Sequence, residues 1–328
     1  MSRSTSYLIE NTTEAMATLG IDLGGTKLAM ALFAESGELL LRETRQLGNR
    51  KGAEVARLIQ DELKRHLAAS EIDGVGVSVP GISRQKTGTV WAPNIEGWED
   101  YPLLSELADV AGTIPVMIDN DRACSILGEQ WKGIAKGCKD VIFIAIGTGI
   151  GAGILADGNI LRGSNDIAGS IGWMALPKPF ESKYIPCGCF EFYASGDGIP
   201  KFALEVLDAD PTGSVLRIHP RQLLTARHVF DAYDEEDPVA VTIIRECISY
   251  WGMAAANLVS IFNPEKVIFG GGIFGPAAKF INDIKEEATK WGQPISMKQV
   301  TFEHSALGGD AAVYGAAFLA MNNKVLTT

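Results

Sequence analysis

The apolar positions along the chain follow two periods, one typical of strands and the other of helices. Residues 18–34 and 39–47 have a strand-like pattern, which a pair of glycines interrupts at Gly24-Gly25. Residues 54–69 are predicted to form a helix, because a period near 3.6 collects their apolar side chains on one face: Val55, Leu58, Ile59, Leu63 and Leu67. The same two periods predict strands at 75–79 and 116–118 and helices at 103–110 and 122–132.

The second half of the chain opens as the first half does. An apolar run at 141–146 meets a glycine-rich bend at 147–151, and a second apolar run follows at 152–156. A turn at Asp157-Gly158 then leads to a short strand at 160–161. This order of strand, bend, strand, turn and strand indicates an internal duplication.

The remaining pattern predicts further strands and helices. Residues 238–262 have the pattern of a long helix, with a break expected near Gly252. The other elements are a strand at 266–269, a helix at 274–291, a strand at 300–303 and a helix at 310–322. Alternating strands and helices predict a layered α/β fold.

Length and composition fit a globular protein of two domains. The chain has 328 residues, and single cores stop growing at about 250–300 residues. Apolar residues make up 46% and charged residues 21%. A net charge of −11 argues against nucleic acid as a partner, since binding it requires a basic surface. Local backbone N–H groups and a metal ion can still bind phosphates within an acidic protein.

Compartment and membrane contact are also constrained by the sequence. No stretch approaches the roughly 20 uninterrupted apolar residues of a membrane span. Residues 1–16 are expected to be a loose arm, since their polar sequence lacks the apolar core of a signal peptide. Five cysteines do not make a disulfide framework, so we expect a cytoplasmic protein without a membrane partner.

Two glycine-rich bends are candidate phosphate sites. The first is the segment 22–27, where glycines let backbone N–H groups approach phosphate oxygens and Asp22 can orient a hydrated Mg²⁺. The second is the segment 147–151, which lacks the Gly-Lys-Ser/Thr of a Walker A loop and is followed by a strand rather than a helix. Each bend alone could be a plain hairpin turn. As mirror images in a duplicated chain, they could hold a triphosphate from two sides.

Two further segments follow buried strands. Asn120-Asp121 ends one strand just before a helix, where Asp121 is either the helix N-cap or a general base that accepts a proton from an alcohol. Gly270-Gly271-Gly272 stands between a strand and a helix. It is either a simple connecting turn or a platform on which a base and ribose lie against the backbone.

Taken in order, these motifs resemble the ROK family (repressor, open reading frame, kinase), which includes bacterial glucokinases. The matching segments run through nearly the whole chain: 22–27, 78–81, 92–94, 120–121, 147–153, 168–169, 188–191 and 270–272. The resemblance implies the two-domain actin-like ATPase fold that sugar kinases share with heat-shock chaperones. It also implies an ATP- and Mg²⁺-dependent kinase that phosphorylates a sugar or sugar-like polyol and works as a homodimer. We expect a smaller lobe of residues 1–121 plus 308–328 and a larger lobe of residues 122–307.

The resemblance also assigns roles to single residues. Asp121 is implied as the catalytic base, and Asp22 as a Mg²⁺ ligand through water. Lys27 is implied at the phosphates, although an exposed lysine on a hairpin is the simpler explanation. The implied sugar ligands are Gly81, Asn94, Asn120 and Glu191. The implied nucleotide-binding residues are Gly24, Gly25, Thr26, Gly147, Thr148, Gly149, Gly271 and Gly272.

The segment from Gly163 to Trp173 departs from the family pattern. Asp166, Ser170 and Trp173 stand where the family usually has Gly, Glu and His. Ser170 and Trp173 are therefore predicted to line an altered acceptor pocket, unless the segment has shifted and Trp173 belongs to the core. The cysteines that join the family's His on a structural zinc are also incomplete, because only Cys189 matches a ligand position and Cys187 stands at a variable one. We expect no zinc.

Two other classes of protein remain open. An altered pocket would suit a non-catalytic binding protein left over from a kinase, and the fold would suit a different ATPase, such as a chaperone. Only 21 residues precede Asp22, so we do not expect the helix-turn-helix of the family's repressors.

Overall fold

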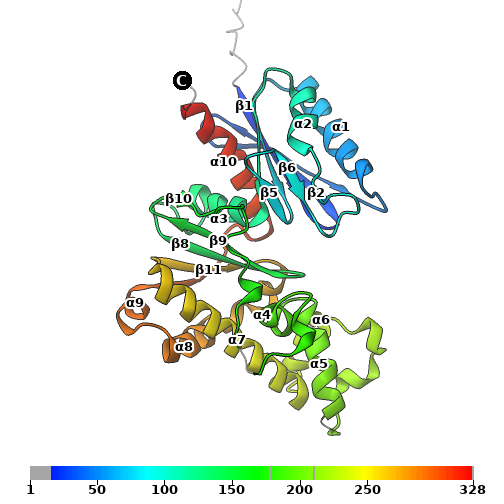
Figure 1. Ribbon diagram of the computed structural model, residues 1–328, viewed down its shortest axis with the longest axis vertical. Helices are drawn as coiled ribbons and strands as arrows, with labels where there is room; N and C mark the ends of the chain where they lie inside the picture. Colours follow the sequence, from blue (N-terminus) through cyan, green and yellow to red (C-terminus); the bar gives the residue numbers. More distant parts are fainter. Residues whose placement is uncertain (1–15, 177–178, 210, 327–328) are drawn as a thin grey trace, which may run out of the picture.

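A five-stranded sheet forms the first part of the protein. The computed structural model describes residues 16–176, 179–209 and 211–326 (Figure 1), so the predicted loose arm lies outside the described residues except for Met16. The sheet has the order β3-β2-β1-β4-β7. Its strands are β1 (Ala17–Leu23), β2 (Lys27–Ala34), β3 (Leu39–Gln46), β4 (Ile72–Val79) and β7 (Val116–Asn120). β1, β2 and β3 are antiparallel, whereas β4 and β7 continue the sheet in parallel with β1.

Two helices and a small hairpin complete this part. Helix α1 (Ala53–Ala69) buries Val55, Ile59 and Leu63, the face that its apolar period predicts. Helix α2 (Leu103–Ala111) packs beside it, and Gln60 of α1 donates a hydrogen bond to Glu106 of α2. A hairpin not predicted from the sequence, β5 (Ile82–Arg84) with β6 (Thr89–Trp91), follows β4.

The second part of the protein repeats the first sheet. Its strands are β8 (Val141–Ile146), β9 (Ile150–Ala156), β10 (Asn159–Ile160), β11 (Lys266–Gly270) and β12 (Thr301–His304), in the order β10-β9-β8-β11-β12. As in the first sheet, the three strands that come first in the chain are antiparallel and the later two add in parallel. This matching topology is what the predicted duplication requires.

Further helices complete the second part of the protein. They are α4 (Cys189–Ala194), α5 (Gly198–Ala209), α6 (Ala226–Asp234), α7 (Pro238–Phe262), α8 (Ile281–Trp291) and α9 (Pro294–Gln299). The predicted break of α7 near Gly252 is wrong, because the helix is continuous over 25 residues. Gly252 instead lets α8 approach, since a Cβ there would lie 2.6 Å from Glu287 Cγ. The predicted helix at 274–291 is correct only from Ile281, after two short 3₁₀ turns.

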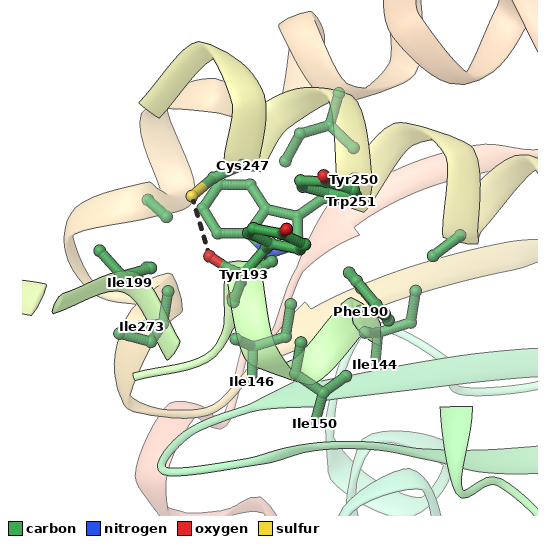
Figure 2. Close-up of a cluster of buried hydrophobic side chains, with 14 of the residues drawn as sticks. Ile144, Ile146, Ile150, Phe190, Tyr193, Ile199, Cys247, Tyr250, Trp251 and Ile273 are labelled. Carbon is green, nitrogen blue, oxygen red and sulfur yellow. Dashed lines mark hydrogen bonds between the residues drawn. The ribbon is translucent and has the colours of Figure 1, made fainter. Parts of the chain in front are cut away.

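The core of the second part supports the glycine-rich bend between β8 and β9. Ile146 and Ile150, on either side of the bend, are buried against a cluster that contains Tyr193, Tyr250 and Trp251 (Figure 2). The rings of Tyr193 and Tyr250 stack with centroids 4.9 Å apart, and Trp251 donates a hydrogen bond to the carbonyl of Ala194.

Within the described residues, no helix has the length and apolar character needed to cross a bilayer.

Two helices connect the two sheets through contacts between backbones. Helix α10 (Ala311–Leu326) packs on β1, β4 and α3 (Asp121–Lys132), and it lies between the first sheet and α3 in Figure 1. Glycines make the close approach possible: a Cβ on Gly76 would lie 1.7 Å from the Ala316 carbonyl oxygen, and one on Gly315 would lie 1.6 Å from that of Cys124. Gly20 and Gly128 have similar neighbours at 2.4 and 2.1 Å. The lobe boundary near residue 121 remains a prediction.

The contact between α3 and α10 can be tested with Gly315→Ala. Alanine favours a helix over glycine by about 1 kcal/mol, but here its methyl group would overlap a backbone carbonyl that cannot move independently. Overpacking of this kind costs about 1–3 kcal/mol, so we expect a lower urea midpoint. Gly213→Ala is the control, because no heavy atom lies within 4 Å of its added Cβ. An unchanged midpoint for Gly315→Ala would contradict the close approach of these helices.

Candidate active site

The carboxyl ends of three parallel strands bring the first group of predicted site residues together. In the sheet register, Asp22 of β1 lies opposite Ser78 of β4, and Ser78 lies opposite Asp119 of β7. Because parallel strands end at one edge of a sheet, Gly81 and Asp121, which follow β4 and β7, lie at that same edge. In open α/β sheets this edge is where ligands bind.

Asp22 is a partly buried carboxylate in a polar setting. Its Oδ1 atom accepts a hydrogen bond of 2.7 Å from Ser78 Oγ. Burial raises the pKa of Asp22 to about 6, and the charges of Asp121 and Asp310 act in the same direction, while Ser78 and Lys27 oppose it. A nearby cation would hold this carboxylate ionised. Lys27 itself is exposed, together with Gly25 and Thr26 on the bend.

Asn120, rather than Asp121, caps helix α3. The side-chain oxygen of Asn120 accepts a 3.0 Å hydrogen bond from the backbone N–H of Ala123, which satisfies one of the free donors of the first turn. Asp121 is therefore not needed as the cap, and its side chain remains 46% exposed at the sheet edge. Loss of solvent around the Asp121 carboxyl raises its pKa, whereas the charge and the backbone N–H of Arg122 lower it. The interpretation of Asp121 as the helix N-cap is therefore wrong, and its role as a general base stays a prediction.

Gly81 has a conformation and a neighbour that a larger residue could not keep. Its φ angle is +85°, and a Cβ would lie 2.1 Å from the carbonyl oxygen of Trp91. The Gly81 carbonyl accepts a 2.9 Å hydrogen bond from Arg122 Nη2. Asn94 lies by the first bend, since its Nδ2 atom is 3.9 Å from the position of a Cβ on Gly25.

Glu191 lies beside the second glycine-rich bend. Its Oε2 atom accepts a 2.6 Å hydrogen bond from the backbone N–H of Ile150, and a Cβ on Gly149 would lie 2.7 Å from this oxygen. Burial raises the pKa of Glu191, and the charge of Asp197 adds to this effect. The turn between α4 and α5 also supports the bend, because Asp197 N–H donates to the Thr148 carbonyl over 3.2 Å.

The bends leave backbone exposed as a nucleotide site requires. Gly147 and Gly272 have no heavy atom within 4 Å of an added Cβ. Gly271, with a φ of +87°, packs against Ile146, since a Cβ would lie 2.4 Å from its carbonyl oxygen. Gly271 follows β11, which is parallel to β8, so this turn and Gly147–Gly149 share one edge of the second sheet. Glycine backbone of this kind fits a polyphosphate and nucleoside.

The carboxylates fit a divalent cation. Asp22 and Asp121 repel each other electrostatically, and burial raises the pKa of both groups. Carboxylate oxygens are the ligands that Mg²⁺ prefers, commonly with waters completing its coordination. The donor set at this edge therefore suits Mg²⁺ held by Asp22 through water.

The departing segment is partly exposed. Trp173, at the end of a 3₁₀ turn (Ile171–Trp173), is 57% exposed, so the alternative that it belongs to the core is wrong. Gly172 next to it lies against Glu191, 2.9 Å from added Cβ to Oε2. Ser170 Oγ donates to the Ile167 carbonyl over 2.9 Å. Asp166, at a positive φ of 61°, accepts a 3.1 Å hydrogen bond from the backbone N–H of Gln85.

The sequence analysis missed two arginines. Arg162, after β10, forms an ion pair with Asp119, which is 1% exposed and precedes the Asn120-Asp121 pair. Arg122 contacts both Gly81 and Asp121. Arg162 and Asp119 are 43 residues apart, so no local pattern could reveal their contact. Arg122 could have been noticed as a charged residue directly after a proposed base.

The fold is the two-domain actin-like ATPase fold of the sugar kinases. The chain belongs to the ROK family, whose family model matches residues 18–323. A glucokinase from Halalkalibacterium halodurans is 35% identical over 92% of this chain and 94% of its own length. A beta-glucoside kinase from Listeria innocua is 28% identical over 92% and 97%.

A solved relative has the same fold. The ROK family glucokinase from Streptomyces griseus, in complex with glucose and AMPPNP, has a TM-score of 0.76 and 29% sequence identity. The match covers 93% of this chain and 99% of that chain. The predicted family and fold class are thus confirmed.

We predict that the purified, tag-free protein contains no stoichiometric zinc. The four histidines, His66, His219, His228 and His304, all lie outside the segment 163–191, and Cys189 Sγ donates to the Met174 carbonyl. In the part of the chain that the structure describes, one cluster could hold a metal by its geometry: Glu43, Glu62 and His66. Arg45 and Arg65 already pair with its carboxylates. A structural zinc site needs four ligands, which this segment does not supply. Elemental analysis showing about one zinc per chain would contradict the prediction.

Proposed function

We propose that this protein is an ATP-dependent kinase that transfers the γ-phosphoryl group to a hydroxyl of a sugar or sugar-like polyol. The observation that carries the proposal is the position of Asp121. Its carboxylate is not used to cap α3, is partly exposed at the sheet edge, and lies within electrostatic range of Asp22. The similarity to glucokinases supports the same conclusion.

The proposed mechanism assigns each group a task that its surroundings support. Asp121 accepts the proton of the acceptor hydroxyl while the hydroxyl oxygen bonds to the γ-phosphorus, and the bond from that phosphorus to the bridging oxygen breaks so that ADP leaves. Asp22 would hold a hydrated Mg²⁺, which would supply positive charge beside the phosphate oxygens. The N–H groups of Gly24 and Gly147 already donate to the carbonyls of Lys27 and Gly149, so the backbone of Gly25 and Gly149 is what the two bends offer to the phosphates. Gly271-Gly272 supports the nucleoside. Phosphoryl transfer depends mainly on such positioning and charge stabilisation.

The acceptor ligands in this proposal are Gly81, Asn94, Asn120 and Glu191. Asn120 uses its side-chain oxygen for the helix cap and one amide hydrogen for Asp119, so its second amide hydrogen is the group available to a sugar hydroxyl. Glu191 keeps one carboxylate oxygen beyond the bond to Ile150. These donors and acceptors would orient the hydroxyl toward Asp121.

We expect Asp121→Asn to lower kcat by about 10²–10⁴-fold, because asparagine keeps the size but cannot accept the proton. The KM for the acceptor should change less. The measurement is ADP release that depends on an added sugar, compared with Asp109→Asn, a change at an exposed residue of α2. Near-normal turnover of Asp121→Asn with the best acceptor would remove Asp121 from this role.

The acceptor is proposed to be a modified hexose or a sugar-like cyclitol. Ser170 is too short to accept bonds from two adjacent hydroxyls, and the exposed Trp173 offers an apolar face with a single N–H donor. Asp166 does not replace the missing carboxylate fully, because one of its oxygens already binds Gln85 N–H. One protein to which this chain is similar is named a beta-glucoside kinase, which supports a modified hexose as the class of acceptor.

The acceptor proposal predicts a change of preference in Ser170→Glu/Trp173→His. The natural protein should have a higher kcat/KM for other polyols than for glucose, and the double variant should shift toward glucose. Polar groups that pair a hydroxyl discriminate steeply, so the shift should be large. A panel of sugars, amino sugars and cyclitols measures it. A natural protein that already prefers glucose at ordinary kinase efficiency would refute the altered pocket.

The same assay separates the alternative functions. A non-catalytic binding protein would bind sugar or nucleotide without releasing ADP. A chaperone-like ATPase would release ADP without needing a polyol.

A further inference from the structure

Arg122, the second residue of α3, lies among three parts of the candidate site. Its Nη2 atom donates a 2.9 Å hydrogen bond to the Gly81 carbonyl, and its Nε atom is 3.7 Å from Asp121 Oδ1. Its backbone N–H donates to the same Asp121 oxygen over 2.9 Å. Only 14% of the side chain is exposed. One arginine thus contacts the loop after β4 and the proposed base.

Strand β9 has a shape that accommodates this arginine. A Cβ on Gly151 would lie 2.4 Å from Arg122 Cδ, and a Cβ on Gly153 would lie 2.2 Å from the Arg122 carbonyl oxygen. Any larger residue at either position would push the arginine or the start of α3 away. The arginine is therefore enclosed by the second sheet on one side while it binds the loop from the first sheet on the other.

We propose that Arg122 is a positioning residue for phosphoryl transfer, which holds the Gly81 loop and the Asp121 carboxylate in one fixed arrangement. This inference rests on the proposed kinase function and deepens it. An acceptor hydroxyl must meet Asp121 while the sugar rests on the Gly81 loop, so both must keep their relative position to within a fraction of an ångström. A guanidinium suits the task because its planar fork can serve two acceptors in different directions.

A lysine could not do the same. An ammonium group could approach Asp121 or the Gly81 carbonyl, but its flexible stem does not fix it to both. A methionine would fill the space beside Gly151 and bind neither. These two replacements therefore separate the charge from the fork geometry.

The kinetic test uses Arg122→Met and Arg122→Lys, with Arg227→Met as the control, since the Arg227 side chain is 85% exposed on α6. For Arg122→Met we expect kcat to fall by about 10²-fold and the acceptor KM to rise, with the ATP KM unchanged. Arg122→Lys should recover part of kcat but not the acceptor KM. A purely structural arginine would instead lower the thermal midpoint without this split between the two substrates.

A double-variant cycle with Asp121→Asn completes the test. If Arg122 acts through Asp121, Arg122→Met should reduce kcat far less in the Asp121→Asn background than in the natural protein. Equal losses in both backgrounds, or natural kinetics in Arg122→Met, would overturn the inference while leaving the kinase function intact. A natural protein that phosphorylates no member of the polyol panel would overturn the proposed function and this inference with it.

Discussion

The close packing of α10 against the first sheet and α3 is the constraint on which the rest of the structure depends. Here backbone meets backbone, because Gly76 and Gly315 leave no side chain between the elements. The same strands, β1 and β4, carry Asp22 and the Gly81 loop at their ends, and α3 begins with Asp121. Contacts only a few residues along the same elements thus help to set the distance between the proposed base, Asp121, and the proposed metal ligand, Asp22.

Much of the fold could be predicted because strong periods mark its long elements. Helix α1 and strands β1, β2 and β8 match the pattern closely. Elements of few residues, such as α4 and the β5–β6 hairpin, carry too short a pattern to reveal their period. The error at Gly252 has a different cause. The glycine allows the close approach of α8, but a glycine within a helical pattern is also typical of a helix break, and the sequence alone does not distinguish the two.

The candidate site, like the fold, has features that a local sequence pattern indicates and others that only the structure shows. The glycine-rich bends and Asn120-Asp121 are local motifs, so the sequence could indicate them. What it could not decide was which of Asn120 and Asp121 caps α3, because both residue types cap helices well. The pairing of Asp119 with Arg162 and the contact of Arg122 with Gly81 join residues far apart in the chain. The sequence also left open whether Trp173 is buried in the core, and only the structure shows that its side chain is exposed.

The position of α10 also has a consequence for how the protein is made. The slot that it fills is lined by Gly20, Gly76 and Gly128, all of which leave the ribosome before the second sheet has been translated. The face of the first sheet that α10 covers is therefore exposed while β8 to β12 are synthesised. Nascent chains with such open faces are prone to wrong associations, so chaperone binding or slow translation would matter most in this interval. Because α10 packs on the first sheet only after it has been synthesised, the candidate site is completed at a late stage of folding.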